Sequence, residues 1–206
     1  MSAQLYLAST SPRRRELLRQ LNLSFDTLDP NIDESIQSNE GAEDYVLRMA
    51  REKARAAFDR LGVGDCASYS SNTNNGVSPI VLAADTAVIC DQDILGQPAH
   101  QQQGQAMLNQ LSGRSHWVYS AVTCMSTERL ESVLVKSKVY FRTLTRQEIV
   151  DYWQTGEPEG KAGGYAIQGI AAVFIERLEG SFSAVMGLPL FEVNALLEQF
   201  NIRALG

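Results

Sequence analysis

Charged residues in four separate stretches of the sequence are of the types that bind a phosphorylated ligand. Arg13 and Arg14 open a predicted helix in "SPRRRELL", where the positive end of the helix dipole disfavours cations. A helix N-terminus with hydroxyl groups and arginines nearby makes a good anion site. Leu17 and Leu18 mark the apolar face, so these two arginines should lie at the mouth of the core and Arg15 towards solvent. A solvated run of charge is the alternative interpretation.

Lys53 is a second cation in an unusual place. In "YVLRMAREKARAAF" it falls on the apolar stripe of a predicted helix, with Val46 and Ala57, whereas Arg51 and Arg55 point away from that stripe. One interpretation is a lysine at the edge of the core whose ammonium reaches water. The other is a phosphate-binding cation.

Asp85 and Thr86 interrupt the apolar run "VLAADTAVIC". A carboxylate in such a run is costly unless it turns the chain, finds a partner or binds a metal. A turn or bulge is therefore one interpretation. The other makes Asp85 a general base or metal ligand at a strand end, where sites in α/β folds usually form. Glu34 in "NIDES" is the candidate companion carboxylate.

The glycine-rich stretch "GKAGGYAIQG" is the fourth candidate. Its clustered glycines would let a ligand approach the backbone closely. Lys161 adds a cation, and the amide of Gln168 can donate and accept hydrogen bonds at a base edge. A simple glycine-rich turn is the alternative. Together, the cationic stretches and the framed carboxylate suggest a phosphorylated ligand with a divalent metal.

Composition limits the metal and the partners. The 206 residues hold two histidines and three scattered cysteines, which argues against a zinc site and against a disulfide framework. A metal would be held by carboxylates, here Asp85 and Glu34, and oxygen ligands favour Mg²⁺ or Mn²⁺. The net charge of −6 argues against nucleic acid or a membrane surface as a partner. Cysteine usage, and a start that reads as a strand, predict a cytoplasmic protein.

Strands and helices must position these residues. Hydrophobic periodicity and end signals predict a mixed α/β fold. Strands are expected at 4–9, 24–30, 80–90, 93–96, 116–125, 131–141 and 170–178. Helices are expected at 12–21, 42–61, 99–111, from the capping box at Thr145 to Gly156, and at 189–200. The strands at 116–125 and 131–141 should form a hairpin.

The chain is predicted to form one domain over residues 1–206. The polar stretch 62–79, rich in serine and asparagine, is long for a loop in a compact domain. We interpret it as a mobile surface insertion.

Several blocks together resemble the Maf family of nucleoside triphosphate pyrophosphatases. They occur in order along nearly the whole chain: "LASTSPRRRELL", "AREKA", "AADTAV", "MLNQLSG", "KAGGYAIQG" and "GSFSAVMGLPL". The "YAIQG" form is similar to the branch that acts on dTTP and UTP. A sister branch, linked to methylated GTP, carries Glu-Gly in place of Gln-Gly.

The resemblance implies a cytoplasmic, often dimeric fold in which a strongly twisted mixed sheet is flanked by helices, with two lobes around a central cleft. The implied reaction converts dTTP or UTP and water to the monophosphate and pyrophosphate with Mg²⁺ or Mn²⁺. The catalytic acid/base falls on Asp85, and substrate selection falls on Arg13, Thr86 and Gln168. The positions that line the phosphate and metal site are Ser9, Glu34, Lys53 and Lys161, and Arg14 is a further candidate for substrate binding.

Water attack at the α-phosphorus agrees with the residues themselves, because it needs a base, a metal and cations that hold the polyphosphate. Gln168 can offer N–H and C=O together to the O4 and N3–H edge of uracil or thymine, a pattern that cytosine reverses.

The segment "LGQP" departs from the family pattern, because Gln97 stands where the family usually has lysine. The loss of one cation could weaken substrate binding, and Arg14 or Arg15 could compensate. A second function therefore stays open, that of a nucleotide-binding regulator of septum formation with weak or no catalysis. A third alternative, from the sister branch, is a pyrophosphatase for methylated GTP.

Overall fold

The computed structural model describes residues 4–62 and 78–204. The loop insertion predicted at 62–79 therefore lies almost entirely outside the described residues. The described strands are Gln4–Ala8 (β1), Asp26–Leu28 (β2), Pro79–Cys90 (β3), Asp93–Leu95 (β4), Ser115–Met125 (β5), Leu130–Phe141 (β6) and Ile175–Glu179 (β7).

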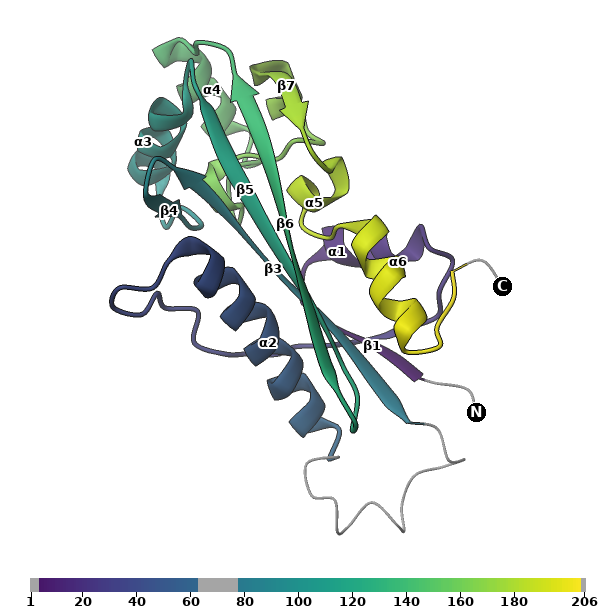
Figure 1. Ribbon diagram of the computed structural model, residues 1–206. Coiled ribbons are helices and arrows are strands. Elements are labelled where there is room, and N and C mark those ends of the chain that lie inside the picture. Colours follow the sequence, from purple (N-terminus) through teal and green to yellow (C-terminus); the bar gives the residue numbers. More distant parts are fainter. Residues whose placement is uncertain (1–3, 63–77, 205–206) are drawn as a thin grey trace. The chain divides into compact units, whose positions relative to one another are not determined.

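These strands form a mixed sheet in the order β2-β1-β3-β5-β6-β7, with β4 paired to β3 (Figure 1). Strand β1 pairs in parallel with both β2 and β3. The β3/β4 and β6/β7 pairs are antiparallel. The mixed α/β fold predicted from the sequence is confirmed. The hairpin predicted between the two long strands also forms, since β5 and β6 are neighbours and Ser126 N donates to Arg129 O at 2.9 Å.

The helices agree closely with the expected ones. Their bounds are Pro12–Arg19 (α1), Ala42–Arg60 (α2), Gln101–Leu111 (α3), Arg146–Gln154 (α4), Phe182–Met186 (α5) and Leu190–Gln199 (α6), with 3₁₀ helices at Ala162–Gly164 (η2) and Ile170–Phe174 (η3). Helix α5 has no counterpart among the expected helices. Within the described part of the chain, no helix combines the length and the hydrophobicity that crossing a membrane requires.

Capping signals read from the sequence explain where two helices begin. The hydroxyl of Ser11 accepts from Arg14 N, with proline at the start of α1. The capping box of α4 is complete, because the Thr145 side chain accepts from Glu148 N and the Glu148 side chain accepts from Thr145 N.

The strand expected at 170–178 is wrong in its first half. Residues Ile170–Phe174 form η3, and only Ile175 onwards belongs to β7. The carboxylate of Glu157 accepts hydrogen bonds from the backbone N–H groups of Ile170 and Ala171. Because these donors are already bonded, they cannot join a sheet ladder.

The chain divides into two compact units. The described residues of unit 1 lie within Met1–Asp85, Ala121–Leu134 and Gly187–Gly206, and unit 2 consists of Thr86–Ser120 and Val135–Met186. The single domain and the cleft between two lobes expected from the sequence stay predictions.

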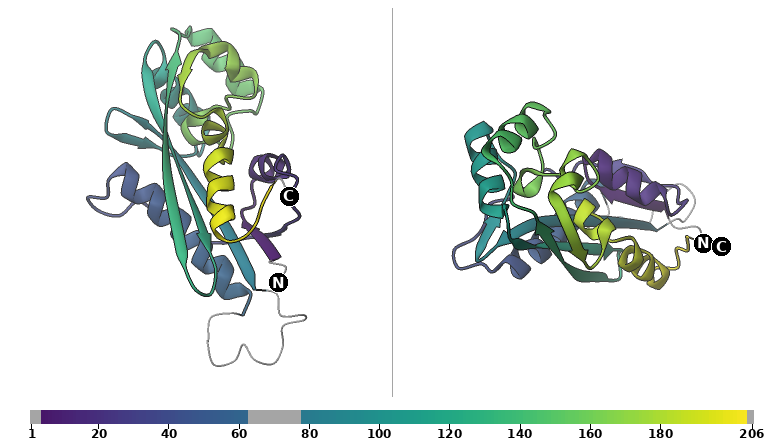
Figure 2. Two further views of the ribbon diagram at one scale, coloured as in Figure 1. Left: turned by 45° about the vertical axis from the view of Figure 1, so that its right-hand side comes forward. Right: turned by 90° about the horizontal axis from the view of Figure 1, so that it is seen from above.

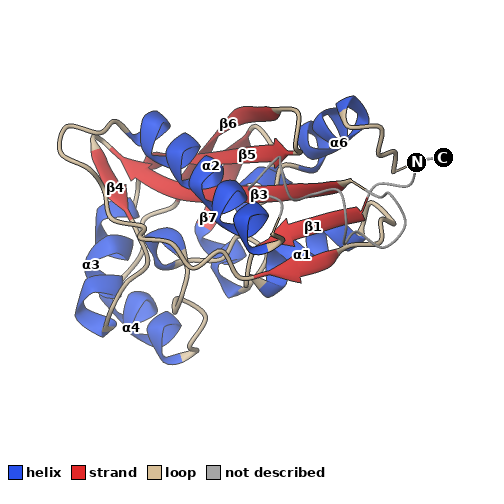
Figure 3. Ribbon diagram, turned by 90° about the horizontal axis from the view of Figure 1, so that it is seen from below, coloured by secondary structure: helices blue, strands red, loops and turns tan. Residues whose placement is uncertain are grey.

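In unit 1, helix α2 covers β1 and β3 (Figure 3). Ala54 and Ala57 of α2 pack with Ala8 of β1 and with Val81 and Ala83 of β3. These small side chains let the helix approach the strands closely. Helix α1 lies near the segment that leads into α6 (Figure 2), and Arg14 Nε donates to Gly187 O at 2.9 Å.

The core of unit 2 joins β3, β5 and β6 to the helices α3 and α4. His116 is 2% exposed there, and its Nε2 lies 2.7 Å from the hydroxyl of Tyr165. Where α3 meets α4, Gly104 faces the ring of Trp153. A Cβ atom at Gly104 would lie 2.2 Å from that ring, so only glycine fits this contact.

Candidate functional site

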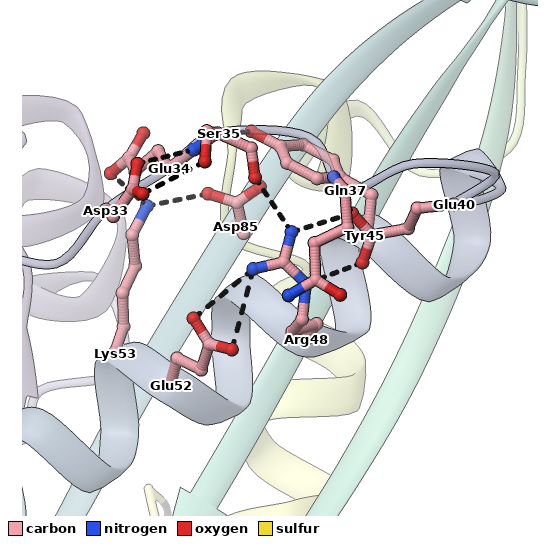
Figure 4. Close-up of polar contacts among 10 residues, drawn as sticks. All are labelled: Asp33, Glu34, Ser35, Gln37, Glu40, Tyr45, Arg48, Glu52, Lys53 and Asp85. Carbon is pink, nitrogen blue, oxygen red and sulfur yellow. Dashed lines mark hydrogen bonds and ion pairs between the residues drawn. The ribbon is translucent and has the colours of Figure 1, made fainter.

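The candidate site of unit 1 is centred on Lys53, whose ammonium lies between two carboxylates (Figure 4). Its Nζ is 2.7 Å from Asp85 Oδ1 and 2.7 Å from Glu34 Oε1. The side chains of Lys53 and Asp85 are 7% and 8% exposed, whereas that of Glu34 is 51% exposed. The cluster is therefore closed on the Asp85 side and accessible to solvent on the Glu34 side.

The elements explain why Lys53 and Asp85 are buried. Lys53 lies on the face of α2 that also buries Val46 and Ala57, as the helical periodicity predicts. Asp85 lies within β3 among buried apolar residues and does not turn the chain. The ammonium of Lys53 bonds carboxylates and is shielded from water, so the interpretation of Lys53 as a lysine that reaches water does not hold.

Arg14 is the second cation that acts on this cluster. Burial lowers the pKa of its guanidinium below the ordinary value, and the negative charges of Asp85 and Glu34 oppose that shift. Its Nε donates to the backbone oxygen of Gly187, 173 positions later in the sequence, and this bond fixes the side chain. Arg15 lies instead beside Arg19, where both line an open pocket between α1 and the segment that leads into β2.

Burial raises the pKa of the Asp85 carboxyl above its usual range. Lys53 and Arg14 oppose this rise, and the nearby charge of Glu34 adds to it. A raised pKa makes the Asp85 carboxylate a stronger base than an exposed aspartate. A functional site is where such a shift is often found.

Glu34 reaches Lys53 because the loop that carries it is fastened to α2. Arg48 of α2 donates to Glu40 through two nitrogens, at 2.5 and 2.6 Å, and to the backbone oxygen of Ser35 at 2.9 Å (Figure 4). These bonds raise the pKa of Arg48 and lower that of Glu40. The guanidinium of Arg48 therefore holds the loop at Ser35 and again at Glu40.

Tyr45 and Arg60 of α2 add two further ties to the same loop. The Tyr45 hydroxyl donates to Glu34 O at 3.1 Å, and Arg60 donates to Asp29 O. Burial and the neighbouring charges of Asp85 and Glu34 raise the pKa of Tyr45 to about 12, so this phenol remains a donor at neutral pH.

Ser9 and Arg13 lie close to Arg14 along the chain. Ser9 follows β1, is 4% exposed, and accepts from Ser11 N at 3.1 Å, which shapes the turn into α1. Arg13 is half-buried on the first turn of α1.

Three predicted site residues belong to unit 2. Thr86 follows Asp85 directly in β3, and its hydroxyl lies 2.9 Å from that of Ser120. Gln168 is exposed. Lys161 donates from Nζ to Glu159 O at 2.8 Å.

Gln97 lies beside the segment that carries Lys161. A Cβ atom placed on Gly160 would be 4.0 Å from Gln97 Oε1, and Gly163 N donates to Gly96 O at 3.0 Å. The two segments are therefore neighbours within unit 2.

The structure thus brings Glu34, Lys53 and Asp85 together, with Arg14 acting on them. Sequence reasoning missed Tyr45 and Arg48, which place Glu34. Both residues lie on α2 outside its apolar stripe, as most polar residues of the helix do, so the sequence carried no signal that singled them out.

The donor set of Asp85 and Glu34 fits Mg²⁺ or Mn²⁺. These ions take oxygen ligands, and Mg²⁺ is commonly held by one or two carboxylates together with substrate phosphates. Among residues 4–62 and 78–204, no group of three or more histidine, cysteine or acidic side chains could hold a metal by itself. Two carboxylates would leave most coordination positions of such an ion to other ligands.

Comparisons with known proteins cover almost all of the chain. A family model described as Maf-like protein matches residues 4–200. A "dTTP/UTP pyrophosphatase" from Photobacterium profundum is 47% identical over 201 residues, which is 97% of this chain and 98% of the relative. The protein of that name from Vibrio vulnificus (strain YJ016) is 45% identical over 197 residues, or 96% of this chain and 98% of the relative.

A third relative of the same name comes from Alkalilimnicola ehrlichii. It is 48% identical over 198 residues, covering 96% of this chain and 93% of the relative. Among solved structures, the Staphylococcus aureus Ham1 protein matches with a TM-score of 0.47 and 12% identity, over 96% of this chain and 99% of that one.

Proposed function

Because this chain belongs to the Maf family, we propose that it is a nucleoside triphosphate pyrophosphatase that hydrolyses dTTP and UTP. Water attacks the α-phosphorus and forms a new P–O bond. The bond from this phosphorus to the bridging oxygen breaks, and pyrophosphate leaves. The other product is the nucleoside monophosphate.

Asp85 is the proposed general base. Its carboxylate accepts a proton from the attacking water, and its raised pKa suits this task. The ion pair with Lys53 orients the carboxylate before the substrate binds. We propose that Lys53 also moves towards the phosphates as their negative charge enters the site.

Other cations of the chain would neutralise the polyphosphate. Arg13 and Arg14 stand on the first turn of α1, and Lys161 lies in the glycine-rich stretch. The hydroxyl of Ser9 would donate to a phosphate oxygen. Cations that oppose the dipole of α1 in the free protein become favourable when an anion binds there.

Asp85 and Glu34 would hold the divalent metal, Mg²⁺ or Mn²⁺. When bound, the ion supplies positive charge that stabilises the negative charge developing on the phosphate oxygens. Because Glu34 is the more exposed of the two carboxylates, it can leave Lys53 without unfolding α2.

Gln168 is the proposed reader of the base, and Thr86 is proposed to assist in selection. The amide of Gln168 pairs with O4 and N3–H of uracil or thymine. Cytosine presents the opposite pattern, which would leave unpaired polar groups when the amide keeps the orientation that suits uracil and thymine.

One observation carries this proposal: a buried lysine bridges a buried aspartate and a solvent-accessible glutamate at 2.7 Å each. A buried charged cluster is costly to maintain for stability alone. The names of relatives 45–48% identical to this chain support the choice of substrate. The cytoplasmic location and the homodimer expected from the family resemblance remain part of the proposal.

The test is a nucleotide panel with the purified protein in Mg²⁺ or Mn²⁺. It comprises dTTP, UTP, dCTP, CTP and methylated GTP, with pyrophosphate and orthophosphate measured separately. We expect pyrophosphate from dTTP and UTP, and in H₂¹⁸O the label should enter the monophosphate. Orthophosphate as the product would overturn the reaction, and fastest turnover of methylated GTP would overturn the substrate. Tight dTTP binding without turnover would support a nucleotide-binding regulator instead.

The Asp85→Asn variant tests the base. We expect kcat to fall by roughly 10²–10⁴-fold, the usual contribution of a positioned base. Asp59→Asn is the matched control, because Asp59 is exposed on α2 and should keep full activity. Equal kcat values for Asp85→Asn and the unmodified protein would rule out the assigned role.

A further inference from the structure

The carboxylate of Glu157 collects three hydrogen bonds in unit 2. Its Oε1 accepts from the Tyr152 hydroxyl at 2.8 Å and from Ala171 N at 3.2 Å. Its Oε2 accepts from Ile170 N at 2.8 Å. Two of the three donors are consecutive backbone N–H groups, so one side chain fixes the start of η3.

Tyr152 extends these hydrogen bonds to the residues that precede Gln168 in the chain. Its hydroxyl accepts from Ala166 N at 3.3 Å, and its side chain lies in the core of unit 2. Burial and the bond to Glu157 raise the pKa of the Tyr152 phenol, so it stays protonated and remains a donor. Glu157 and Tyr152 therefore hold the backbone at Ala166 and again at Ile170.

The segment between these two anchors is a tight turn that exposes one side chain. Gly169 N donates to Ala166 O at 3.0 Å. Ala166 and Ile167 are 4% and 6% exposed, whereas Gln168 points out of the core. The amide of Gln168 is thus carried by a backbone that is bonded on both sides.

Gly169 shows how closely the carboxylate packs against this turn. A Cβ atom there would lie 2.2 Å from Glu157 Oε2. The backbone at Gly169 has a φ of −108°, which any residue can adopt. The need for glycine therefore comes from the space that Glu157 occupies.

We propose that Glu157 is a positioning residue for base selection: together with Tyr152 it fixes the backbone of residues 166–171, so that the Gln168 amide meets the pyrimidine at one distance and angle. The inference rests on the proposed function, in which Gln168 reads the base. An amide discriminates between O4 and an amino group only if its support does not shift to accommodate either one. Glu157 itself does not touch the substrate.

The experiment compares kcat/KM for dTTP and dCTP in the full-length protein and its Glu157→Gln variant. Glutamine keeps the shape of the side chain but can no longer accept at both atoms. We expect the dTTP:dCTP ratio to fall by about 10-fold, the value of roughly one hydrogen bond. The loss should appear in the KM for dTTP, while turnover of dCTP changes little.

Two further variants separate this inference from the proposed function. Glu159→Gln is the matched control, since it removes the same charge from an exposed side chain two residues away and should keep the ratio. Gln168→Ala should lower the ratio, and adding Glu157→Gln to it should lower the ratio no further. If Gln168→Ala leaves the ratio unchanged, the base-reading role fails. If Gln168→Ala lowers the ratio but folded Glu157→Gln does not, the positioning role fails.

Tyr152→Phe covers the case in which Glu157→Gln does not fold. It removes one hydroxyl and keeps the ring in the core. We expect it to lower the dTTP:dCTP ratio in the same direction. Equal losses of activity on both nucleotides would show a merely structural anchor and overturn the proposal.

Discussion

Lys53 holds two carboxylates that differ in their access to water. Asp85 is almost fully buried, whereas half of the Glu34 side chain is exposed. Removing one partner of a buried ion pair typically costs about 3–5 kcal/mol, because it leaves an uncompensated charge. Loss of Lys53 should therefore threaten the fold more than loss of Glu34, whose partner keeps Asp85.

The pKa of Asp85 predicts the acid side of the pH–rate profile. As a base, Asp85 must be ionised, so kcat/KM should fall as the pH drops through its pKa. Because burial raises this pKa above 3.8, the acid limb should lie above the pH at which an exposed aspartate titrates. Lys53→Gln removes a charge that opposes the rise, so the limb of its residual activity should move to higher pH.

Both proteins are measured with dTTP, so that titration of the substrate's own phosphates cancels in the comparison. A limb that stays at the same pH in Lys53→Gln would contradict the assignment of this titration to Asp85.

How far the sequence could predict the site depends on the kind of signal each residue leaves. Lys53 and Asp85 stand out because a charge interrupts an apolar pattern. Arg48 lies on a polar helix face, where an arginine is unremarkable, and its partner Glu40 is placed only by the path of the loop. A contact between a helix and an irregular loop has no periodicity, so this part of the site required the structure.

At the scale of elements, the loop before α2 behaves as part of that helix. Arg48, Tyr45 and Arg60 donate from α2 to three backbone oxygens of the loop. Irregular segments usually have few such ties and move more than the helices beside them. The position of Glu34 is therefore set by α2, the helix that also carries Lys53.

Arg48→Ala should release this loop while leaving α2 folded. We expect kcat/KM for dTTP to fall by about 10-fold, because Glu34 would no longer be held near Lys53. Hydrogen exchange of the amides at 35–37 should become faster, which a general loss of stability would not restrict to this loop. Arg51→Ala is the control, since Arg51 lies on the same helix and bonds Ser132 instead. If the amides at 35–37 exchange at the same rate in Arg48→Ala, Arg48 does not hold the loop in place.

At the contact between α3 and α4, replacing glycine by alanine should have the opposite of its usual effect in a helix. Gly→Ala within a helix normally stabilises a protein by about 1 kcal/mol. Here the methyl group would collide with the Trp153 ring, so Gly104→Ala should destabilise unit 2 by about 1–3 kcal/mol. Urea unfolding measures the change. In a Trp153→Leu background the same substitution should cost much less, and an equal cost in both backgrounds would rule out the collision.

The helices and strands were largely predictable, because capping residues mark the ends of helices and alternating polar and apolar residues mark strands. The error at 170–174 is instructive. "IAAVF" is apolar enough for a strand, but Glu157 occupies the donors that a strand would need. A side chain thirteen residues away in the sequence thus overrides the local preference.

For the whole molecule, we expect His116 to be the main cause of the change in unfolding free energy between pH 6.5 and about pH 4. Burial lowers its pKa from 6.5 to about 4, so between these values the unfolded chain binds more protons than the folded protein. Stability is therefore complete above pH 6.5 and declines as the pH falls towards 4. The shift corresponds to about 3 kcal/mol of unfolding free energy.

Urea unfolding between pH 4 and 7 tests this expectation. His116→Phe should flatten the slope in that window, even if its stability at pH 7 is lower, because the Tyr165 hydroxyl loses its partner. His100→Asn replaces the other histidine, which is exposed, and should keep the slope. The same slope in His116→Phe and the unmodified protein would be inconsistent with this origin.

The stretches that make up the two units could not be read from the residues, and the sequence led to two lobes only through the family resemblance. Each unit is assembled from separate stretches of the chain, so no change in composition or linker marks the boundary. The boundary after Asp85 falls inside β3, where the sequence shows one continuous strand.

The bond from Arg14 to Gly187 also bears on how the protein is made. A ribosome delivers the chain from its N-terminus, and the two bonded residues are 173 positions apart. The bond between Arg14 and Gly187 can therefore form only after Gly187 has emerged. Asp85 and Lys53 are synthesised long before that moment. Until Gly187 is made, a nascent chain can already contain Lys53 and Asp85 but lacks the contact that holds Arg14 beside them in the arrangement proposed here for hydrolysis.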